Sequence, residues 1–469
     1  MKPNFVLFVV DTLRAESLSC YGYPRKTSPF MDNLARNGTL YENFFAQGVP
    51  TEPGFTELLS GVHPLHSGVV SHMGNATYPE DLPWLPSILK NNGYFTMAID
   101  NLNKWFKRGF DEYIDIGGTA TGIADIVAED VNNLVFENKH KLNDAHENGK
   151  PFFLFVHYWD THTPYAPPEP FKGMFYYGEK ENPLNRSVRK IEVMSPIWYI
   201  HKGWMGNITD ENYFTAMYDS EISYVDTAIS KVVEALGKSG LLENTVVIIT
   251  SDHGESMTEH DVYFDHHSLY EQVIHIPLII SGLSFMNKGK RISRLGQHID
   301  IAPTLLELAN INIPKGIDGK SLLNEHLPER KIVSLENTWQ SKISLRTNRY
   351  KIIRTVKDVD LYGRAPDFEE IYDLKKDPAE RINLAYDKNI LSLYSSMLDK
   401  ELSILLGNKP NPVIEQEYSL RGHFNPDRDF VKTGGNKLKK NVCNWKVPSP
   451  EEVTKINFNL SKKTRDRID

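Results

Sequence analysis

A threonine followed two positions later by a proline opens the stretch of this chain with the clearest potential for chemistry. The segment from Thr51 to Gly61 has the pattern of a short helix, with Thr51 at the N-cap position, Pro53 in the first turn and Gly61 after the last apolar residues. A hydroxyl at this place lies at the positive end of a helix dipole, which stabilises an anion or an alkoxide. Threonines at such positions most often only cap the helix, so the functional interpretation depends on the other polar residues.

Five short apolar runs are typical of buried parallel strands, and helical patterns lie between them. These runs are Phe5–Val10, Tyr94–Ile99, Phe152–Val156, Thr245–Ile249 and Pro277–Ile280. The clearest helical pattern begins near Thr209 and places apolar residues from Phe214 to Leu236 on one face. Strands that alternate with helices predict an α/β fold with a mainly parallel sheet flanked by helices on both faces.

Polar residues gather where these runs end. In open α/β sheets the ligand crevice lies beyond the carboxyl ends of the strands, so these positions are candidates for a site. The residues after the first four runs, and just before the fifth, are Asp11; Asp100, Asn101, Asn103 and Lys104; His157, Asp160 and His162; Ser251 to Glu255; and Asp265 to His267.

Asp11, Asp252 and His253 supply two carboxylates and an imidazole at strand ends, and Thr51 offers a further oxygen. Such ligands suit one divalent cation, and the imidazole favours manganese or zinc over calcium or magnesium. A metal bound to Thr51 would lower the pKa of its hydroxyl and turn it into a nucleophile. The alternative for each aspartate alone is that it caps the following helix.

Lys104, His162 and His266 are the candidates for a cationic or proton-donating face. A tetrahedral anion transferred to Thr51 needs its oxygens neutralised and its leaving oxygen protonated. A lone histidine is more often structural than catalytic, and His72, His157 and His267 are left out of the predicted site for that reason.

A second metal held by Asp160, His162 and His266 is a further alternative. Two-metal sites need a fuller second set of ligands than the sequence offers.

The pattern changes beyond about residue 330. Short runs near Ser334, Ser344, Tyr350 and Glu370 predict a small antiparallel sheet, and Leu391 to Leu406 has helical spacing. We therefore expect a catalytic α/β domain over residues 1–328, a small α+β subdomain over 329–408 and an extended tail over 409–469. The polar tail either wraps the surface or serves as the arm of a homo-oligomer.

Composition narrows the classes of partner and compartment. The net charge of −8 argues against a nucleic-acid partner, and no apolar run is long enough to span a bilayer. The apolar N-terminus ends in an acid, which favours a buried strand over a signal peptide. Two cysteines far apart, Cys20 and Cys443, suit a reducing compartment, so we expect a cytoplasmic protein.

With these residues in view, the chain resembles the sulfatase branch of the alkaline phosphatase superfamily from Pro3 to about Leu384. No single matching motif is specific to this family, but the order in which the motifs follow one another is. The matching motifs are Val10-Asp11-Thr12-Leu13-Arg14 with Cys20-Tyr21-Gly22-Tyr23, Ser28 to Ala35, Thr250-Ser251-Asp252-His253-Gly254-Glu255, His266 to Glu271 leading into Ile276-Pro277-Leu278, Asp300 to Leu306, and Ile371 to Leu374 with Asp377-Pro378. The resemblance implies the corresponding fold and an ester hydrolase with a metal.

The departures from the family pattern bear on the reaction. Family sulfatases carry Cys-x-Pro-x-Arg, whose cysteine or serine becomes formylglycine, whereas this chain has Thr51, Pro53 and Phe55 at the matching positions. The segment Asn103-Lys104-Trp105-Phe106 keeps the family lysine and loses a histidine. Asp11 is followed by Thr12 where the family has two aspartates, and Asp252-His253 stands where Asp-Asn is usual.

A threonine with an Asp, Asp, His metal site looks more like the phosphodiesterases and the phosphoethanolamine or glycerophosphate transferases of the superfamily. Asp-His is also similar to the phosphonate monoester hydrolases. We therefore expect a phosphoester hydrolase or transferase acting on a small or glycan-type anionic ester by phosphoryl transfer to Thr51. The alternatives are a sulfatase that works without formylglycine, and an anion-binding protein without turnover.

Overall fold

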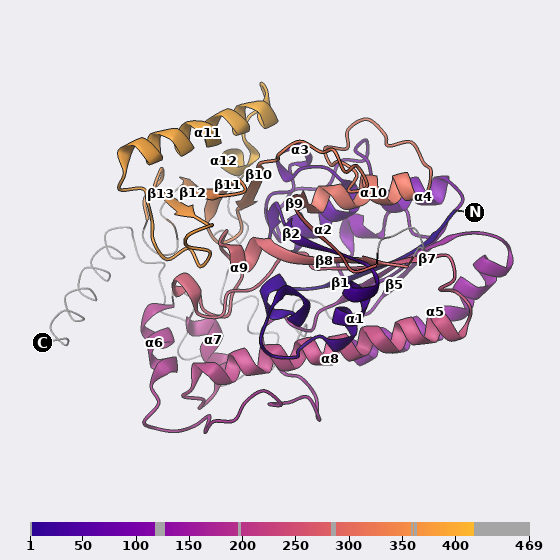
Figure 1. The fold of residues 1–469 in the computed structure, drawn as a ribbon, viewed down its shortest axis with the longest axis horizontal. Helices are drawn as coiled ribbons and strands as arrows, with labels where there is room; N and C mark the ends of the chain where they lie inside the picture. Colours follow the sequence, from indigo (N-terminus) through magenta and orange to yellow (C-terminus); the bar gives the residue numbers. More distant parts are fainter. Residues whose placement is uncertain are drawn as a thin grey trace, which may run out of the picture.

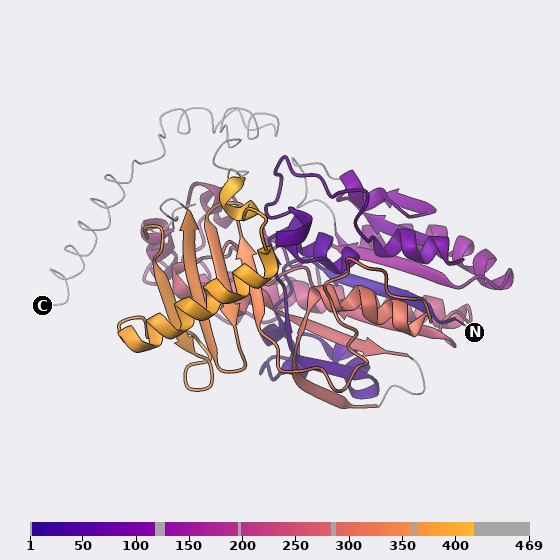
Figure 2. The same cartoon turned by 90° about the horizontal axis from the view of Figure 1, so that it is seen from above.

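Two sheets organise the chain in the computed structural model (Figures 1 and 2). The structure describes residues 2–117, 127–195, 198–282, 288–357, 360 and 364–416, with the side chains of residues 199 and 200 left out. The large sheet has the strand order β5-β4-β6-β1-β7-β8-β2-β9, and the small one has the order β13-β12-β11-β10-β3. The predicted α/β architecture, with a second antiparallel-rich sheet, is confirmed.

The centre of the large sheet is built from the predicted apolar runs. Its strands are β1 (Asn4–Val10), β2 (Thr39–Phe45), β4 (Phe95–Asp100), β5 (Glu112–Asp115), β6 (Phe152–Tyr158), β7 (Thr245–Thr250), β8 (His275–Ser281) and β9 (Lys290–Gln297). The strands β5, β4, β6, β1 and β7 are parallel to one another. The sequence did not predict β2, β5 and β9; β5 and β9 form the edges of the sheet, where polar side chains interrupt the apolar pattern.

The fifth predicted strand runs the other way. β8 is antiparallel to both β7 and β2, so the expectation of a fifth parallel strand is wrong. A parallel return needs a crossover connection, usually a helix, and the segment between β7 and β8 holds only the one-turn elements η5 (Glu259–Asp261) and α9 (Glu271–Ile274). The chain therefore enters β8 at the edge where β7 ends, which keeps Asp265 to His267 at the predicted edge.

Helices cover both faces of the large sheet, as predicted (Figure 1). On one face α1 (Pro29–Asn37), α5 (Ala128–Glu147) and α8 (Glu211–Lys238) pack against the side chains that alternate along β1, such as Val6, Phe8 and Val10. On the other face α2 (Thr51–Ser60), α4 (Leu85–Asn91) and α10 (Ile301–Leu308) pack against Phe5, Leu7 and Val9. The period-two alternation of β1 thus divides the core into two layers.

The remaining elements are short. They are η1 (Ala15–Ser17), η2 (Ser19–Tyr21), α3 (Pro64–Ser67), η3 (Lys104–Lys107), α6 (Ser187–Met194), α7 (Trp198–Met205) and η6 (His298–Asp300). The predicted long helix is α8; its N-cap Asp210 accepts a hydrogen bond from the backbone N–H of Asn212, and Phe214 and Leu236 of its predicted apolar face are buried. In the described part of the chain no helix combines the length and the apolar character that crossing a bilayer requires.

The small sheet is joined to the large domain through a strand from the N-terminal half. It comprises β10 (Ile332–Glu336), β11 (Ser341–Arg346), β12 (Tyr350–Lys357), β13 (Glu369–Asp373) and the two-residue strand β3 (Gly48–Val49), with α11 (Lys388–Leu406) packed across it (Figure 2). β3 pairs in parallel with β10 and lies directly before α2, so the small sheet helps to fix the start of that helix.

The predicted tail is described only at its beginning. There α12 (Pro412–Glu415) buries Val413 in the core of the small sheet. Residues 417–469, with Cys443 and the expected oligomer arm, lie outside the described residues. The expected domain boundaries stay a prediction.

A buried polar contact ties α2 to the end of β7. The carboxylate of Glu57 accepts a hydrogen bond from the backbone N–H of Gln47 at 2.8 Å, and its Oε1 lies 2.7 Å from Nδ1 of His298. The other ring nitrogen of His298 lies 2.6 Å from the backbone oxygen of Ser251, next to Asp252. Both side chains are fully buried.

Replacing this histidine tests whether the contact holds the fold together. In His298→Ala the carboxylate of Glu57 stays buried without its ring partner, which should cost about 3 kcal/mol of unfolding free energy. Urea titration followed by circular dichroism measures the loss, and the exposed His326→Ala is the matched control. If the unfolding free energy of the variant lay within about 0.5 kcal/mol of that of the parent protein, the range usual for surface substitutions, the contact would not be structural.

Candidate active site

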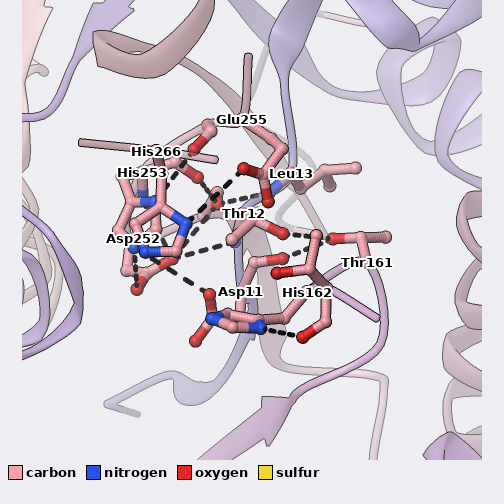
Figure 3. Close-up of polar contacts among 12 residues, drawn as sticks. Asp11, Thr12, Leu13, Thr161, His162, Asp252, His253, Glu255 and His266 are labelled. Atoms are coloured by element: carbon pink, nitrogen blue, oxygen red, sulfur yellow. Dashed lines mark hydrogen bonds and ion pairs between the residues drawn. The ribbon is translucent and has the colours of Figure 1, made fainter. Parts of the chain in front are cut away.

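Asp11, Asp252 and His253 come together because their strands are neighbours. β1 and β7 are parallel with Val9 opposite Thr250, so the residues that follow each strand emerge at the same edge of the sheet. One ligand atom from each of the three residues lies within 4.8 Å of the other two (Figure 3). All three side chains are completely buried. The structure thus assembles the predicted set of carboxylates and imidazole.

The geometry of these side chains fits a bound cation. His253 Nδ1 lies 2.9 Å from the backbone oxygen of Gly254, which leaves Nε2 facing the two carboxylates. Asp252 Oδ1 accepts hydrogen bonds from the backbone N–H groups of Thr12 and His253. Among the residues that the structure describes, both oxygens of Asp11, Asp252 Oδ2 and His253 Nε2 are buried without a hydrogen-bond partner. Buried polar atoms are rarely left unpaired, so this donor set fits a divalent metal ion.

The electrostatics of the pair follow from burial. Burial works to raise the pKa of Asp11, but His157, His162 and His253 together hold it below its usual value. Burial, and then the charge of Asp11, raise the pKa of Asp252 well above its usual range. Burial lowers the pKa of His253, so its ring is neutral at neutral pH and can act as a ligand.

Thr51 lies at the start of α2, one residue later than predicted. The N-cap is Pro50, and Thr51 is the first helical residue, so the expectation that Thr51 caps the helix is wrong by one position. Gly61 ends the helix in the left-handed conformation, as predicted. Thr51 is buried, and its hydroxyl forms no hydrogen bond among the described residues. A cap oxygen would be engaged with the helix, whereas this hydroxyl is free to react.

Gly54 brings the first turn of α2 against the metal cluster. A Cβ added at Gly54 would lie 2.7 Å from the backbone oxygen of Asp252, so only glycine permits this close approach. Thr51 lies three residues before Gly54, in the same turn of the helix. The packing of α2 therefore supports the predicted proximity of Thr51 to Asp252.

His157 is a neighbour of the cluster that the sequence reasoning left out. Its Nδ1 lies 2.8 Å from Asp100 Oδ1, and its Nε2 lies 3.6 Å from Asp11 Oδ2. Burial opposes the charge on this ring, but Asp100 and Asp11 raise its pKa to about 9. The ring of Phe55, which stands where the family arginine is usual, packs 4.5 Å from it. Ile99 of β4 pairs with Val156 of β6, so the residues that follow them, Asp100 and His157, are neighbours at the strand ends. The signal for this pair is the register between the two predicted strands.

His162 and His266, two further residues of the predicted site, lie next to each other beside the cluster. Their ring centroids are 5.2 Å apart, and the ring of His266 lies 4.5 Å from that of His253. His162 Nδ1 lies 2.6 Å from the backbone oxygen of Thr163. Burial, and then the neighbouring histidines, lower the pKa of His266 well below its usual value. With its pKa lowered, His266 is neutral at neutral pH; the expectation that it belongs to a cationic or proton-donating face stays a prediction.

Lys104 has a partner that the sequence reasoning did not consider. Its ammonium group donates a hydrogen bond to Oε1 of Glu52, the residue after Thr51, and His72 Nδ1 lies 3.9 Å from the same oxygen. The Lys104 side chain is 42% exposed and Glu52 only 7%. Lys104 and Asp265 to His267 are otherwise placed as expected, at the edge where the strands end.

A second group of potential ligands lies nearby, but its carboxylate is already engaged. One atom each of Asp265, His266 and His267 lies within 4.8 Å of the others. Asp265 Oδ1 accepts hydrogen bonds from the backbone N–H groups of His266 and His267 and contacts the ring of His267. This carboxylate therefore has internal partners that the carboxylate of Asp11 lacks.

Asp160 does not join His162 and His266. No group of potential metal ligands in the described part of the chain combines these three residues, so the alternative second metal set is not assembled there. Burial raises the pKa of Asp160 to about 7, and its Oδ2 has no hydrogen-bond partner.

The raised pKa of Asp160 predicts a pH-dependent cost. Between its usual pKa and about 7 the unfolded chain releases this proton while the folded chain keeps it, so stability falls as pH rises through that window. Asp160→Asn cannot ionise and should gain stability over the parent at pH 8, by at most about 4 kcal/mol, with the two curves converging near pH 4. Urea midpoints across this range measure the difference, and a difference independent of pH would contradict the assignment.

Metal stoichiometry distinguishes the two ligand groups. Asp11→Asn and His253→Ala should each weaken binding of Mn²⁺ or Zn²⁺ by about 100-fold or more, because each removes a ligand atom. Asp265→Asn, the matched control in the other group, should retain one metal per chain. Calorimetric titration of metal-free protein gives the affinity and the number of metal ions bound per chain. If only Asp265→Asn lost the metal, the metal site would be at Asp265, His266 and His267 instead.

Comparison with known proteins places the chain. The family model described as Sulfatase matches residues 3–311, and one described as N-sulphoglucosamine sulphohydrolase, C-terminal, matches residues 258–406. A Delta 4,5-hexuronate-2-O-sulfatase of Bacteroides thetaiotaomicron is 26% identical over 442 residues, covering 85% of this chain and 88% of that protein.

Solved structures share the fold. One was determined in complex with its substrate D-glucosamine-2-N,6-O-disulfate; it has a TM-score of 0.68 at 21% identity and covers 88% of this chain and 99% of its own. The phosphonate monoester hydrolase of Agrobacterium radiobacter has a TM-score of 0.66 at 19% identity and covers 86% and 95%. With its Sulfatase match across most of the catalytic α/β unit, the chain belongs to the sulfatase family of ester hydrolases.

Proposed function

We propose that the protein is a metal-dependent hydrolase of sulfate esters on saccharides, with Thr51 as the nucleophile. The observation that carries the proposal is the buried group of Asp11, Asp252 and His253, whose unpartnered atoms lie beside the first turn of α2. The sulfatase relatives support a sulfate ester over the phosphoester that the threonine predicts. A relative named for a hexuronate and a fold neighbour solved with a glucosamine disulfate support a saccharide as the alcohol.

Asp11, Asp252 and His253 would hold the metal, with Thr51 Oγ1 as a further ligand, and manganese or zinc suits this set. When bound, the metal supplies Lewis-acid stabilisation of the ester oxygens and lowers the pKa of the Thr51 hydroxyl.

In the first step the oxygen of Thr51 attacks sulfur and its proton passes to water. The bond from sulfur to the saccharide oxygen breaks, and His162 gives that oxygen a proton. His162 is suited to this role because its Nδ1 is held by the backbone oxygen of Thr163, which leaves Nε2 for the leaving group. Lys104 binds an oxygen of the sulfuryl group. In the second step water attacks sulfur and the bond from sulfur to Oγ1 of Thr51 breaks; one proton of this water returns to Thr51 and the other to His162, and sulfate departs.

A phosphoester or phosphonate ester is the second candidate, with hydrolysis or transfer of a phosphoryl group. The observation that favours it is Thr51 itself, because a sulfated threonine has no hemiacetal through which to eliminate sulfate. The Asp252-His253 pair, and the fold shared with a phosphonate monoester hydrolase, agree with this candidate.

A parallel turnover assay on metal-loaded protein decides between the candidates. The substrates are an aryl sulfate, a sulfated disaccharide, aryl phosphate mono- and diesters and an aryl phosphonate. We expect cleavage of the sulfates and a loss of about a thousandfold or more in Thr51→Ala, with Thr51→Ser partly active. The exposed Thr77→Ala is the matched control.

Each other outcome selects a different reaction. Cleavage of phosphorus esters alone, still dependent on Thr51, would establish the second candidate. Sulfate cleavage that survives in Thr51→Ala would exclude Thr51 as the nucleophile. Mass spectrometry of quenched enzyme should find one sulfuryl or phosphoryl group on the peptide that contains Thr51.

A further inference from the structure

Glu52 is a charged residue next to the proposed nucleophile, and the proposed reaction does not use it. It follows Thr51 in the first turn of α2, and 7% of its side chain is exposed. Its Oε1 accepts a hydrogen bond from the ammonium group of Lys104, which is proposed to bind the ester anion. His72 Nδ1 lies 3.9 Å from the same oxygen. An acidic side chain beside an anion site opposes binding of the anion, so its presence there calls for a function.

The charges around the site balance in pairs. Asp11 and Asp252 together offset a divalent cation, Glu52 offsets Lys104, and Asp100 offsets His157. Glu255 lies 3.5 Å from His266 through Oε1 and Nδ1. Because the ammonium group of Lys104 is paired with Glu52, its charge is already offset before an anion binds.

We infer that Glu52 makes the site selective for esters with a single negative charge over esters with two. This inference rests on the proposed function and specifies its substrate class. A sulfate monoester, a phosphodiester and a phosphonate monoester each carry one negative charge. A phosphate monoester carries two in its dianionic form, and the second stays uncompensated beside the carboxylate of Glu52. Without Glu52 the charge of Lys104 would be available to bind it.

A purely structural role for Glu52 has a different signature. If the carboxylate only holds Lys104 in place, its loss disorders Lys104 and weakens the binding of singly and doubly charged ligands alike. If it sets the charge of the site, its loss favours the doubly charged ligand selectively. The ratio between two ligands that differ only in charge therefore separates these roles.

The experiment compares 4-nitrophenyl phosphate with methyl 4-nitrophenyl phosphate, which share a leaving group and differ by one charge at pH 8. In Glu52→Gln we expect the ratio of kcat/KM for the dianion to that for the monoanion to rise about tenfold, the size of one unit-charge interaction at the edge of a protein. Glu52→Asp keeps the charge and should keep the parent ratio. The exposed Glu80→Gln is the matched control. A ratio within about twofold of the parent value in Glu52→Gln would overturn the inference.

A binding measurement keeps the inference testable if no ester is turned over. Calorimetry on metal-loaded protein compares inorganic sulfate, a dianion, with methyl sulfate, a monoanion. Glu52→Gln should increase the affinity for sulfate by about tenfold relative to the affinity for methyl sulfate. An equal change for both anions would overturn the inference. Absence of turnover in the parent protein with selective anion binding intact would instead count against the proposed function alone.

Discussion

Two carboxylates forced together in the core are the constraint on which the rest of this structure depends. The parallel pairing of β1 with β7 fixes Asp11 and Asp252 at one edge of the sheet, where both are fully buried. Burying an ionised carboxylate without a partner costs several kcal/mol, and two adjacent ones cost more. As a result the pKa of Asp11 is lowered and that of Asp252 is raised. A divalent cation held with His253 removes this cost, and the same cation serves the chemistry proposed for Thr51.

The second sheet contributes to this arrangement from outside the large domain. β3 pairs with β10 directly before α2, the Glu57–His298 contact joins that helix to the end of β7, and Gly54 lets it touch Asp252. Thr51 is thus held by three independent contacts rather than by its own side chain. Reactive groups need such support, because a free hydroxyl at a helix start has nothing else to orient it. This explains why Thr51 is buried yet forms no hydrogen bond among the described residues.

Much of this was predictable from the sequence because the apolar runs have one dominant interpretation. Continuous runs such as Phe152–Val156 are typical of strands buried on both faces of an α/β sheet, and that interpretation placed Asp11, Lys104, His162 and Asp252 at one edge. The direction of β8 was not predictable, since an apolar run has no polarity and only the short connection after β7 decides it. Asp160 was misplaced because strand-end position gives the edge but not the direction of a side chain. Glu52 was missed because its partner Lys104 is 52 residues away, and no local pattern records such a pair.

The central claim is that one metal at Asp11, Asp252 and His253 adjoins a reactive hydroxyl at Thr51. A crystal structure of the manganese-loaded protein with orthovanadate, recorded with anomalous data, tests both halves together. The account predicts one anomalous peak bounded by these three side chains, and vanadium bonded to Oγ1 of Thr51 with Lys104 and His162 against its oxygens. A metal peak at Asp265, His266 and His267, or vanadate with no bond to Thr51, would contradict it.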